Sequence, residues 1–68
     1  MYNRRKIYRL DINDNELYEG DFVVGEMEDT PVIGQIVYDA DMSAYVLEME
    51  DLKFPLFNFE CLRKVLYV

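Results

Sequence analysis

Carboxylate and amide side chains are dense in the stretch DINDNELYEGDFV, which begins at Asp11 and is spaced much like a calcium loop. An EF-hand loop needs oxygen ligands at positions 1, 3 and 5, a glycine at position 6 and a bidentate Glu at position 12. Asp11, Asn13 and Asn15 fit the first three ligand positions. Glu16 stands where the glycine is needed, and Phe22 stands where the bidentate Glu is needed. We therefore expect no metal site, and we predict a polar turn whose side chains accept backbone hydrogen bonds.

Nucleophilic catalysis would have to start from Cys61, Ser43, Thr30 or a Tyr, each activated by a neighbouring base. The chain contains no His, which is the usual base and the commonest metal ligand. Cys61 stands between an acidic and an apolar residue, and we expect it to be a small buried hydrophobe. Paired carboxylates can do acid–base work, but 68 residues leave little room for a cleft that excludes water. The three glycines are isolated and form no phosphate-binding loop, so we expect neither enzyme activity nor a cofactor.

The distribution of charge along the chain is strongly uneven. The chain has a net charge of −7, and residues 11–51 contain 13 acids but no Lys or Arg. Binding to nucleic acid requires Lys and Arg to neutralise phosphates, so we expect no direct contact with nucleic acid. We expect the four cations of residues 4–9 to pair with acids of the same chain. An acidic field steers a basic partner, although like charge on a solvated surface also serves solubility alone.

Acidic residues of the central segment are therefore the candidate partner-binding residues. Carboxylates meet Arg in the same forked geometry that phosphates use, which makes mimicry of a nucleic acid chemically feasible. The candidates are Glu26, Glu28, Asp29, Asp39, Asp41, Glu48, Glu50 and Asp51. Because strands alternate their faces, we predict that the acids of successive turns gather on one rim, with Glu28, Asp29, Asp39 and Asp41 together.

These acids would be positioned by short strands, since several short runs are rich in β-branched and aromatic residues. Such runs occupy residues 6–12, 21–27, 31–39, 44–50, 53–59 and 63–68. The clearest pair is 31–39 (PVIGQIVYD) and 44–49 (AYVLEM), which alternate apolar and polar positions on either side of a short polar loop and predict a hairpin. No segment keeps a helical apolar period for three turns. The sequence therefore predicts one all-β domain over residues 1–68, a small and strongly bent SH3-like barrel of five or six antiparallel strands.

Single residues refine this prediction. Gly25 indicates a bulge or a close backbone approach, and Pro55 confines its run to an edge strand or an irregular crossing. Asn58 is suited to cap one short helical turn over residues 58–64. Glu19 and Gly20 predict a second turn after residues 16–18. The residues expected to contribute to the core are Tyr18, Phe22, Ile36, Tyr45 and Leu47.

Residues 10–24, LDINDNELYEGDFVV, resemble the signature of the YopX protein family of phages and prophages, with its Tyr-Glu-Gly-Asp core before an apolar run. Residues 34–48, GQIVYDADMSAYVLE, resemble the hairpin of that family, so the likeness covers about residues 10–49. The chain departs from the family in its shorter N-terminal region and in the absence of the Ile-Gly-Asn-aromatic segment. The resemblance implies a β-barrel-like domain of phage or prophage origin. It implies no reaction and no catalytic residues.

Two functions follow as hypotheses. The first is a phage-encoded inhibitor that occupies the basic nucleic-acid-binding surface of a host protein, for which restriction and CRISPR effectors are natural targets. The second is a non-catalytic assembly module, a homo-oligomer whose interface includes the apolar tail VLYV (65–68). The sequence shows no apolar run near 20 residues and no signal-peptide pattern, and Cys61 is a single cysteine. We therefore expect a protein of the host cytoplasm that has no membrane partner.

Overall fold

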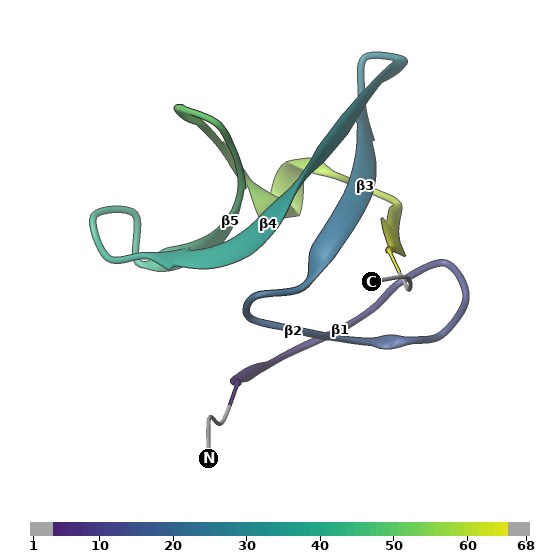
Figure 1. Ribbon diagram of the computed structural model, residues 1–68, viewed down its shortest axis with the longest axis horizontal. Coiled ribbons are helices and arrows are strands. Elements are labelled where there is room, and N and C mark those ends of the chain that lie inside the picture. Colours follow the sequence, from purple (N-terminus) through teal and green to yellow (C-terminus); the bar gives the residue numbers. More distant parts are fainter. Residues whose placement is uncertain (1–3, 66–68) are drawn as a thin grey trace.

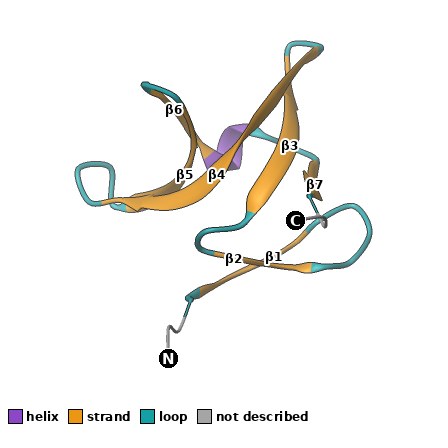
Figure 2. Cartoon of the chain, viewed as in Figure 1, coloured by secondary structure: helices purple, strands orange, loops and turns teal. Residues whose placement is uncertain are grey.

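The structure is a computed structural model that describes residues 4–65. Seven strands and one 3-10 turn follow one another along the chain, and no other helix occurs in this range (Figures 1 and 2). They are β1 (Lys6–Leu10), β2 (Glu16–Tyr18), β3 (Phe22–Met27), β4 (Thr30–Asp39), β5 (Ala44–Met49), β6 (Leu52–Pro55), η1 (Leu56–Asn58) and β7 (Leu62–Lys64). The all-β prediction is confirmed. None of the helices in residues 4–65 has the length and apolar character needed to span a membrane.

The strands form two antiparallel sheets. A five-stranded sheet has the order β6-β5-β4-β3-β7, and β1 pairs with β2 in a separate two-stranded ribbon. The long strand β4 is curved, so that the sheet bends around a common interior, as Figure 1 shows. The last described strand, β7, returns to pair with β3, where Gly25 lies opposite Leu62. The result is a small barrel-like domain in which the C-terminal strand β7 lies beside β3.

The predicted hairpin is confirmed in its position, and the structure gives its register. Gln35 lies opposite Glu48, and Asp39 lies opposite Ala44 at the loop end. Buried and exposed positions alternate along β4, as expected for a strand with one face toward the core.

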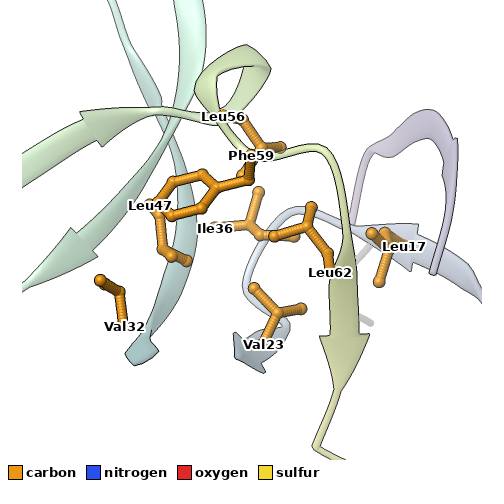
Figure 3. Packing of buried hydrophobic residues seen from close by; sticks show 8 residues of the cluster. All are labelled: Leu17, Val23, Val32, Ile36, Leu47, Leu56, Phe59 and Leu62. Carbon is orange, nitrogen blue, oxygen red and sulfur yellow. The ribbon is translucent and has the colours of Figure 1, made fainter. Parts of the chain in front are cut away.

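The core is a single cluster of apolar side chains contributed by β2, β3, β4, β5, η1 and β7 (Figure 3). Its buried members are Leu17, Val23, Val32, Ile36, Leu47, Leu56, Phe59 and Leu62. Among the predicted core residues, Ile36 and Leu47 are fully buried, whereas Tyr18 and Tyr45 are only half-buried. The prediction for Phe22 is wrong, because its side chain is 54% exposed. Its neighbour Val23 faces inward instead, and adjacent strand positions point to opposite faces.

The C-terminal third differs from the sequence prediction. The helical turn covers Leu56–Asn58, so Asn58 ends the turn and does not cap a turn over residues 58–64. Burial explains the shift, since the turn carries Leu56 into the core and Phe59 follows it there. The placement of Pro55 is confirmed, because it ends β6 at one edge of the sheet. The tail proposed as an oligomer interface lies largely outside the described residues, which end at residue 65.

Gly25 marks a close approach between β3 and the segment that follows η1. A Cβ atom built on Gly25 would lie 2.6 Å from Cδ1 of Phe59 and 3.0 Å from Cδ2 of Leu62. The pairing of β3 with β4 runs without a shift through this position, so the alternative of a bulge is wrong. Because Gly25 has no side chain, the segment after η1 packs directly on β3. This contact brings together the two segments that line the candidate binding site.

Candidate partner-binding site

The turn between β3 and β4 presents two carboxylates at its tip. Met27 pairs with Thr30, so Glu28 and Asp29 alone form the turn, with φ values of 51° and 67°. Two positive φ values in a two-residue hairpin define a type I′ turn, for which Asn-Gly is the favoured sequence. Asp and Asn tolerate this conformation, whereas in a residue with a longer side chain it costs about 1–2 kcal/mol. Glu28 is therefore the residue that the backbone geometry of this turn does not favour.

An open groove lies between this turn and the segment that joins η1 to β7. Its volume is about 560 Å³, and we call it the acidic groove. It is lined by Glu26, Met27, Glu28, Asp29, Asn58, Glu60 and Cys61. The described residues of its lining thus include four carboxylates and no Lys or Arg. Glu26, Glu28, Asp29 and Glu60 are all exposed, so their charges are available to a partner.

A smaller space of about 250 Å³ continues the acidic groove along β3, and we call it the apolar extension. Its lining consists of Ile12, Val24, Gly25, Glu26, Cys61, Leu62 and Arg63. Glu26 and Cys61 line both spaces, so the two adjoin each other. The surface therefore changes from anionic to apolar along one strand.

Asp39 and Asp41 lie at the other end of β4, in the turn that leads to β5. The carboxylate of Asp39 accepts hydrogen bonds from the backbone N–H groups of Asp41, at 2.8 Å, and Met42, at 3.3 Å. It also lies 3.5 Å from Nζ of Lys53. Burial alone would raise the pKa of Asp39, but these N–H groups and the ammonium lower the pKa below its usual value. Asp39 thus stabilises its own turn.

The single rim predicted for Glu28, Asp29, Asp39 and Asp41 does not form. Consecutive turns of an antiparallel meander lie at opposite ends of the strand they share, and here that strand is β4. Figure 1 shows the two turns well apart.

Glu48, Glu50 and Asp51 form a separate acidic cluster. Glu50 and Asp51 make the turn between β5 and β6, and Glu50 has a φ of 55°. Glu48 pairs with Gln35, so this turn lies toward the same end of β4 as Glu28 and Asp29. The cluster contributes no lining residue to the acidic groove. Of the eight candidate acids, three share one groove.

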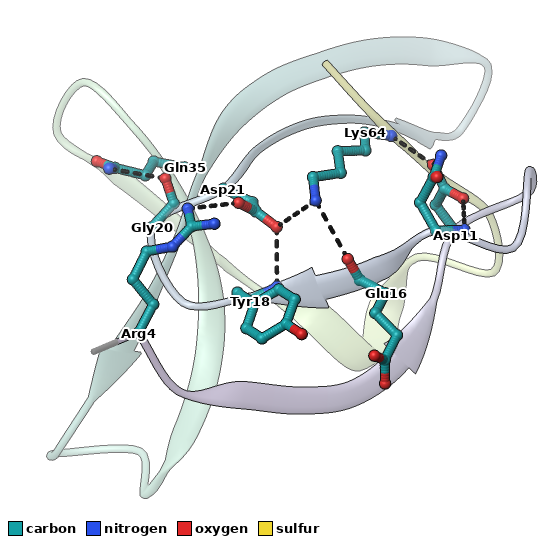
Figure 4. A network of polar contacts seen from close by, with 9 residues as sticks. Arg4, Asp11, Glu16, Tyr18, Gly20, Asp21, Gln35 and Lys64 are labelled. Carbon is teal, nitrogen blue, oxygen red and sulfur yellow. Dashed lines mark hydrogen bonds and ion pairs between the residues drawn. The ribbon is translucent and has the colours of Figure 1, made fainter. Parts of the chain in front are cut away.

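The basic residues are largely engaged in contacts within the described chain: Arg4 and Lys6 pair with acids as expected, whereas Arg9 binds backbone carbonyls instead. Arg4 contacts Asp21 at 2.6 Å, and Lys64 lies 3.3 Å from the same carboxylate (Figure 4). Lys6 lies 3.1 Å from Glu16. The hydrogen bond to Glu16 raises the pKa of Lys6. Arg9 donates to the backbone carbonyls of Leu56 and Phe59, which holds β1 against η1. These contacts leave no continuous basic surface on the described part of the chain.

The turn that begins at Asp11 is a polar turn, as predicted. The carboxylate of Asp11 accepts backbone hydrogen bonds from Asn13 at 2.9 Å, Asn15 at 2.8 Å and Lys64 at 2.9 Å. The side-chain amide of Asn15 donates to it as well. Burial by itself would raise the pKa of Asp11, but these four hydrogen bonds lower it to about 2. Both oxygens therefore face N–H donors, and β7 is tied to the turn.

Over residues 4–65 no group of three or more potential ligands is placed so that it could hold a metal ion.

Cys61 is exposed, so the expectation of a buried hydrophobe is wrong. Phe59 and Leu62 carry the burial of this segment, and the two residues between them remain at the surface. The lining residues that sequence reasoning missed are Met27, Asn58, Glu60 and Cys61. The sequence signal for these residues was the pair of apolar residues Phe59 and Leu62, together with Gly25. In the structure both apolar side chains pack on Gly25, and this contact positions the two walls of the groove.

No family model, curated protein or solved structure matches this chain. The likeness of residues 10–24 and 34–48 to the YopX family stays a prediction.

Proposed function

We propose that this protein is a non-catalytic binding module that receives a basic surface of a partner protein in the acidic groove. One observation carries the proposal: Glu26, Glu28, Asp29 and Glu60 line one open groove whose described lining has no cation. A carboxylate accepts the two parallel N–H bonds of an Arg much as a phosphate does. A surface built to bind nucleic acid therefore offers the groups that this groove can engage.

The internal contacts of the Lys and Arg residues support the same function. Five of the seven Lys and Arg residues make internal contacts, so they do not neutralise the groove. An anionic surface of this kind accelerates the approach of a basic partner and repels nucleic acid. The partner we propose is a host protein that binds DNA or RNA, with which this protein competes.

The resemblance to a phage family extends the proposal to a biological setting. A phage product that occupies a nucleic-acid-binding surface would inhibit a host defence nuclease, such as a restriction or CRISPR effector, in the host cytoplasm.

A second candidate function is assembly into a homo-oligomer. It is favoured by β6, which forms one edge of the five-stranded sheet and carries Leu52 at 52% exposure, and by Phe57 in η1, which is 74% exposed. Edge strands are templates for pairing, although Lys53 and Pro55 in this strand oppose it. Sedimentation of the purified chain distinguishes the two candidates, because only assembly gives a mass above that of the monomer.

The groove proposal is tested with two matched variants that each remove four charges. The groove variant carries Glu26→Gln, Glu28→Gln, Asp29→Asn and Glu60→Gln. The control variant carries Asp41→Asn, Glu48→Gln, Glu50→Gln and Asp51→Asn, all outside the groove. The two variants have the same net charge, so a difference in partner binding between them is due to the position of the removed charges.

Each variant is used for affinity capture from host lysate, and the captured protein is then titrated with DNA or RNA. We expect the control variant to retain the partner, the groove variant to lose it, and nucleic acid to displace the wild type. Raising the salt concentration should weaken capture, because exposed charges are screened over about 8–10 Å. Equal retention of the partner by both variants would show that the groove is not the binding face.

A further inference from the structure

The apolar extension adds an apolar surface beside the acidic groove. A partner that bound through charge alone would not need this surface. Ile12 is 58% exposed, and its backbone N–H donates to the carbonyl of Leu62 at 2.9 Å, which fixes its position. Val24 is half-buried, and its cross-strand neighbour Ile33 is 57% exposed on the same face. Exposed apolar side chains that lie beside a groove with a polar rim are typical of an interface core.

We propose that the partner is held through an extended segment that carries one apolar side chain and, four residues along, a run of Arg or Lys. This inference rests on the proposed function and specifies its partner. The apolar side chain would occupy the apolar extension beside Ile12, Val24 and Leu62. The cations would meet Glu28, Asp29 and the other carboxylates of the acidic groove.

The order of charges determines which way the segment lies. Arg63 lines the apolar extension, whereas the described lining of the acidic groove contains carboxylates and no cation. A partner cation placed beside Arg63 meets a like charge, and the same cation placed beside Glu28 meets an opposite one. The apolar side chain therefore belongs at the Arg63 end and the basic run at the turn.

The spacing of the two features follows from the geometry of β3. Val24 and Glu28 are four residues apart, and since β3 ends at Met27 this separation is at most about 13 Å at ~3.3 Å per residue. An extended partner covers this distance in the same number of residues. A helix would need about nine, at ~1.5 Å per residue.

The test uses three synthetic decapeptides with a fluorescent label. The first has a Leu four positions before three arginines, the second has Ser in place of the Leu, and the third keeps the Leu but has Gln in place of every Arg. Affinity is measured by fluorescence anisotropy at low salt, and the site is located from backbone amide shifts of the labelled protein. Burying one Leu side chain predicts about tenfold tighter binding of the first peptide than of the second. The third should bind most weakly, and the shifts should lie at Val24, Cys61 and Leu62.

Two variants locate the apolar contact. Ile12→Ser should abolish the roughly tenfold advantage of the Leu peptide and leave the affinity of the Ser peptide unchanged. Leu52→Ser, at a similarly exposed apolar residue on β6, should leave the advantage intact. The folded state of both variants is checked by their amide spectra. Should Ile12→Ser not fold, the shift map of the wild-type protein decides, because shifts confined to the turn would overturn the inference.

The outcomes separate this inference from the function on which it rests. If the Leu and Ser peptides bind equally, and Glu28→Gln with Asp29→Asn weakens both, the apolar contact is refuted and the acidic groove remains the binding face. If neither arginine peptide binds, or the shifts lie at the β5–β6 turn, both proposals fail. An unchanged Leu advantage in Ile12→Ser would also overturn the inference.

Discussion

Asp11→Asn tests whether one buried carboxylate holds the wall of the groove. Asp11 is 5% exposed, and its oxygens accept four hydrogen bonds, one of them from the backbone N–H of Lys64 in β7. In Asp11→Asn, the side-chain NH₂ group would face N–H donors whose hydrogen bonds the carboxylate accepts. The pKa of Asp11 falls from 3.8 to about 2 in the folded protein, which corresponds to a stabilisation of about 2 kcal/mol. A domain of this length is stable by only roughly 3–10 kcal/mol, so the loss is measurable.

The pH dependence gives the prediction its direction. Because the folded pKa is depressed, the contribution is complete above pH 4–5 and is lost as the pH falls through about 2. Urea unfolding at pH 6 should show a midpoint lower by about 1–2 M in Asp11→Asn, at a slope near ~1 kcal/mol/M. The difference should largely vanish at pH 2. Asp14→Asn in the same turn is the control, since Asp14 is exposed with a φ of 65° that Asn tolerates. A midpoint difference that stayed constant with pH would refute the reasoning.

Three further variants test the contacts and the turn around the site. Gly25→Ala should lower the free energy of unfolding by about 1–3 kcal/mol in urea, because its Cβ would lie 2.6 Å from the ring of Phe59. Replacing Glu28 by Asn and Asp29 by Gly should raise the melting temperature, since Asn-Gly suits a type I′ turn, while weakening partner binding; a lower melting temperature would contradict the turn assignment. Arg9→Gln should cost about 1–2 kcal/mol in the same unfolding assay, because two carbonyls beside η1 lose a shared charged donor, and an unchanged midpoint would show that these contacts do not matter.

Local chemistry made the fold class and the central hairpin predictable. The alternation of PVIGQIVYD reports a strand with one buried face, and the structure places Val32 and Ile36 in the core accordingly. The turn at Asp11 was predictable for the same reason, since Asp and Asn satisfy backbone donors within a few residues. It was not predictable that Val23 faces the core and Phe22 faces outward, because both residues suit a strand and only the register decides between them.

The candidate site was half predictable. Charge alone pointed to Glu26, Glu28 and Asp29, but charge could not say that the turn at Asp39 lies at the other end of β4. Glu60, on the second wall of the groove, comes from a segment far along the chain, and only the tertiary contact of β3 with the residues after η1 brings it there. Long-range contacts of this kind leave little trace in local sequence patterns.

The most direct test of the central claim uses Cys61, which is exposed, lines the groove and is the single cysteine of the chain. A photo-cross-linker attached to this thiol samples the groove, and a matched label on Ala40→Cys in a Cys61→Ser background samples the turn between β4 and β5. With the captured host partner, we predict that position 61 cross-links to it and that added DNA or RNA suppresses the product, while position 40 gives little. Cross-linking from position 40 as strong as from position 61, or a product from position 61 that nucleic acid does not reduce, would contradict the account.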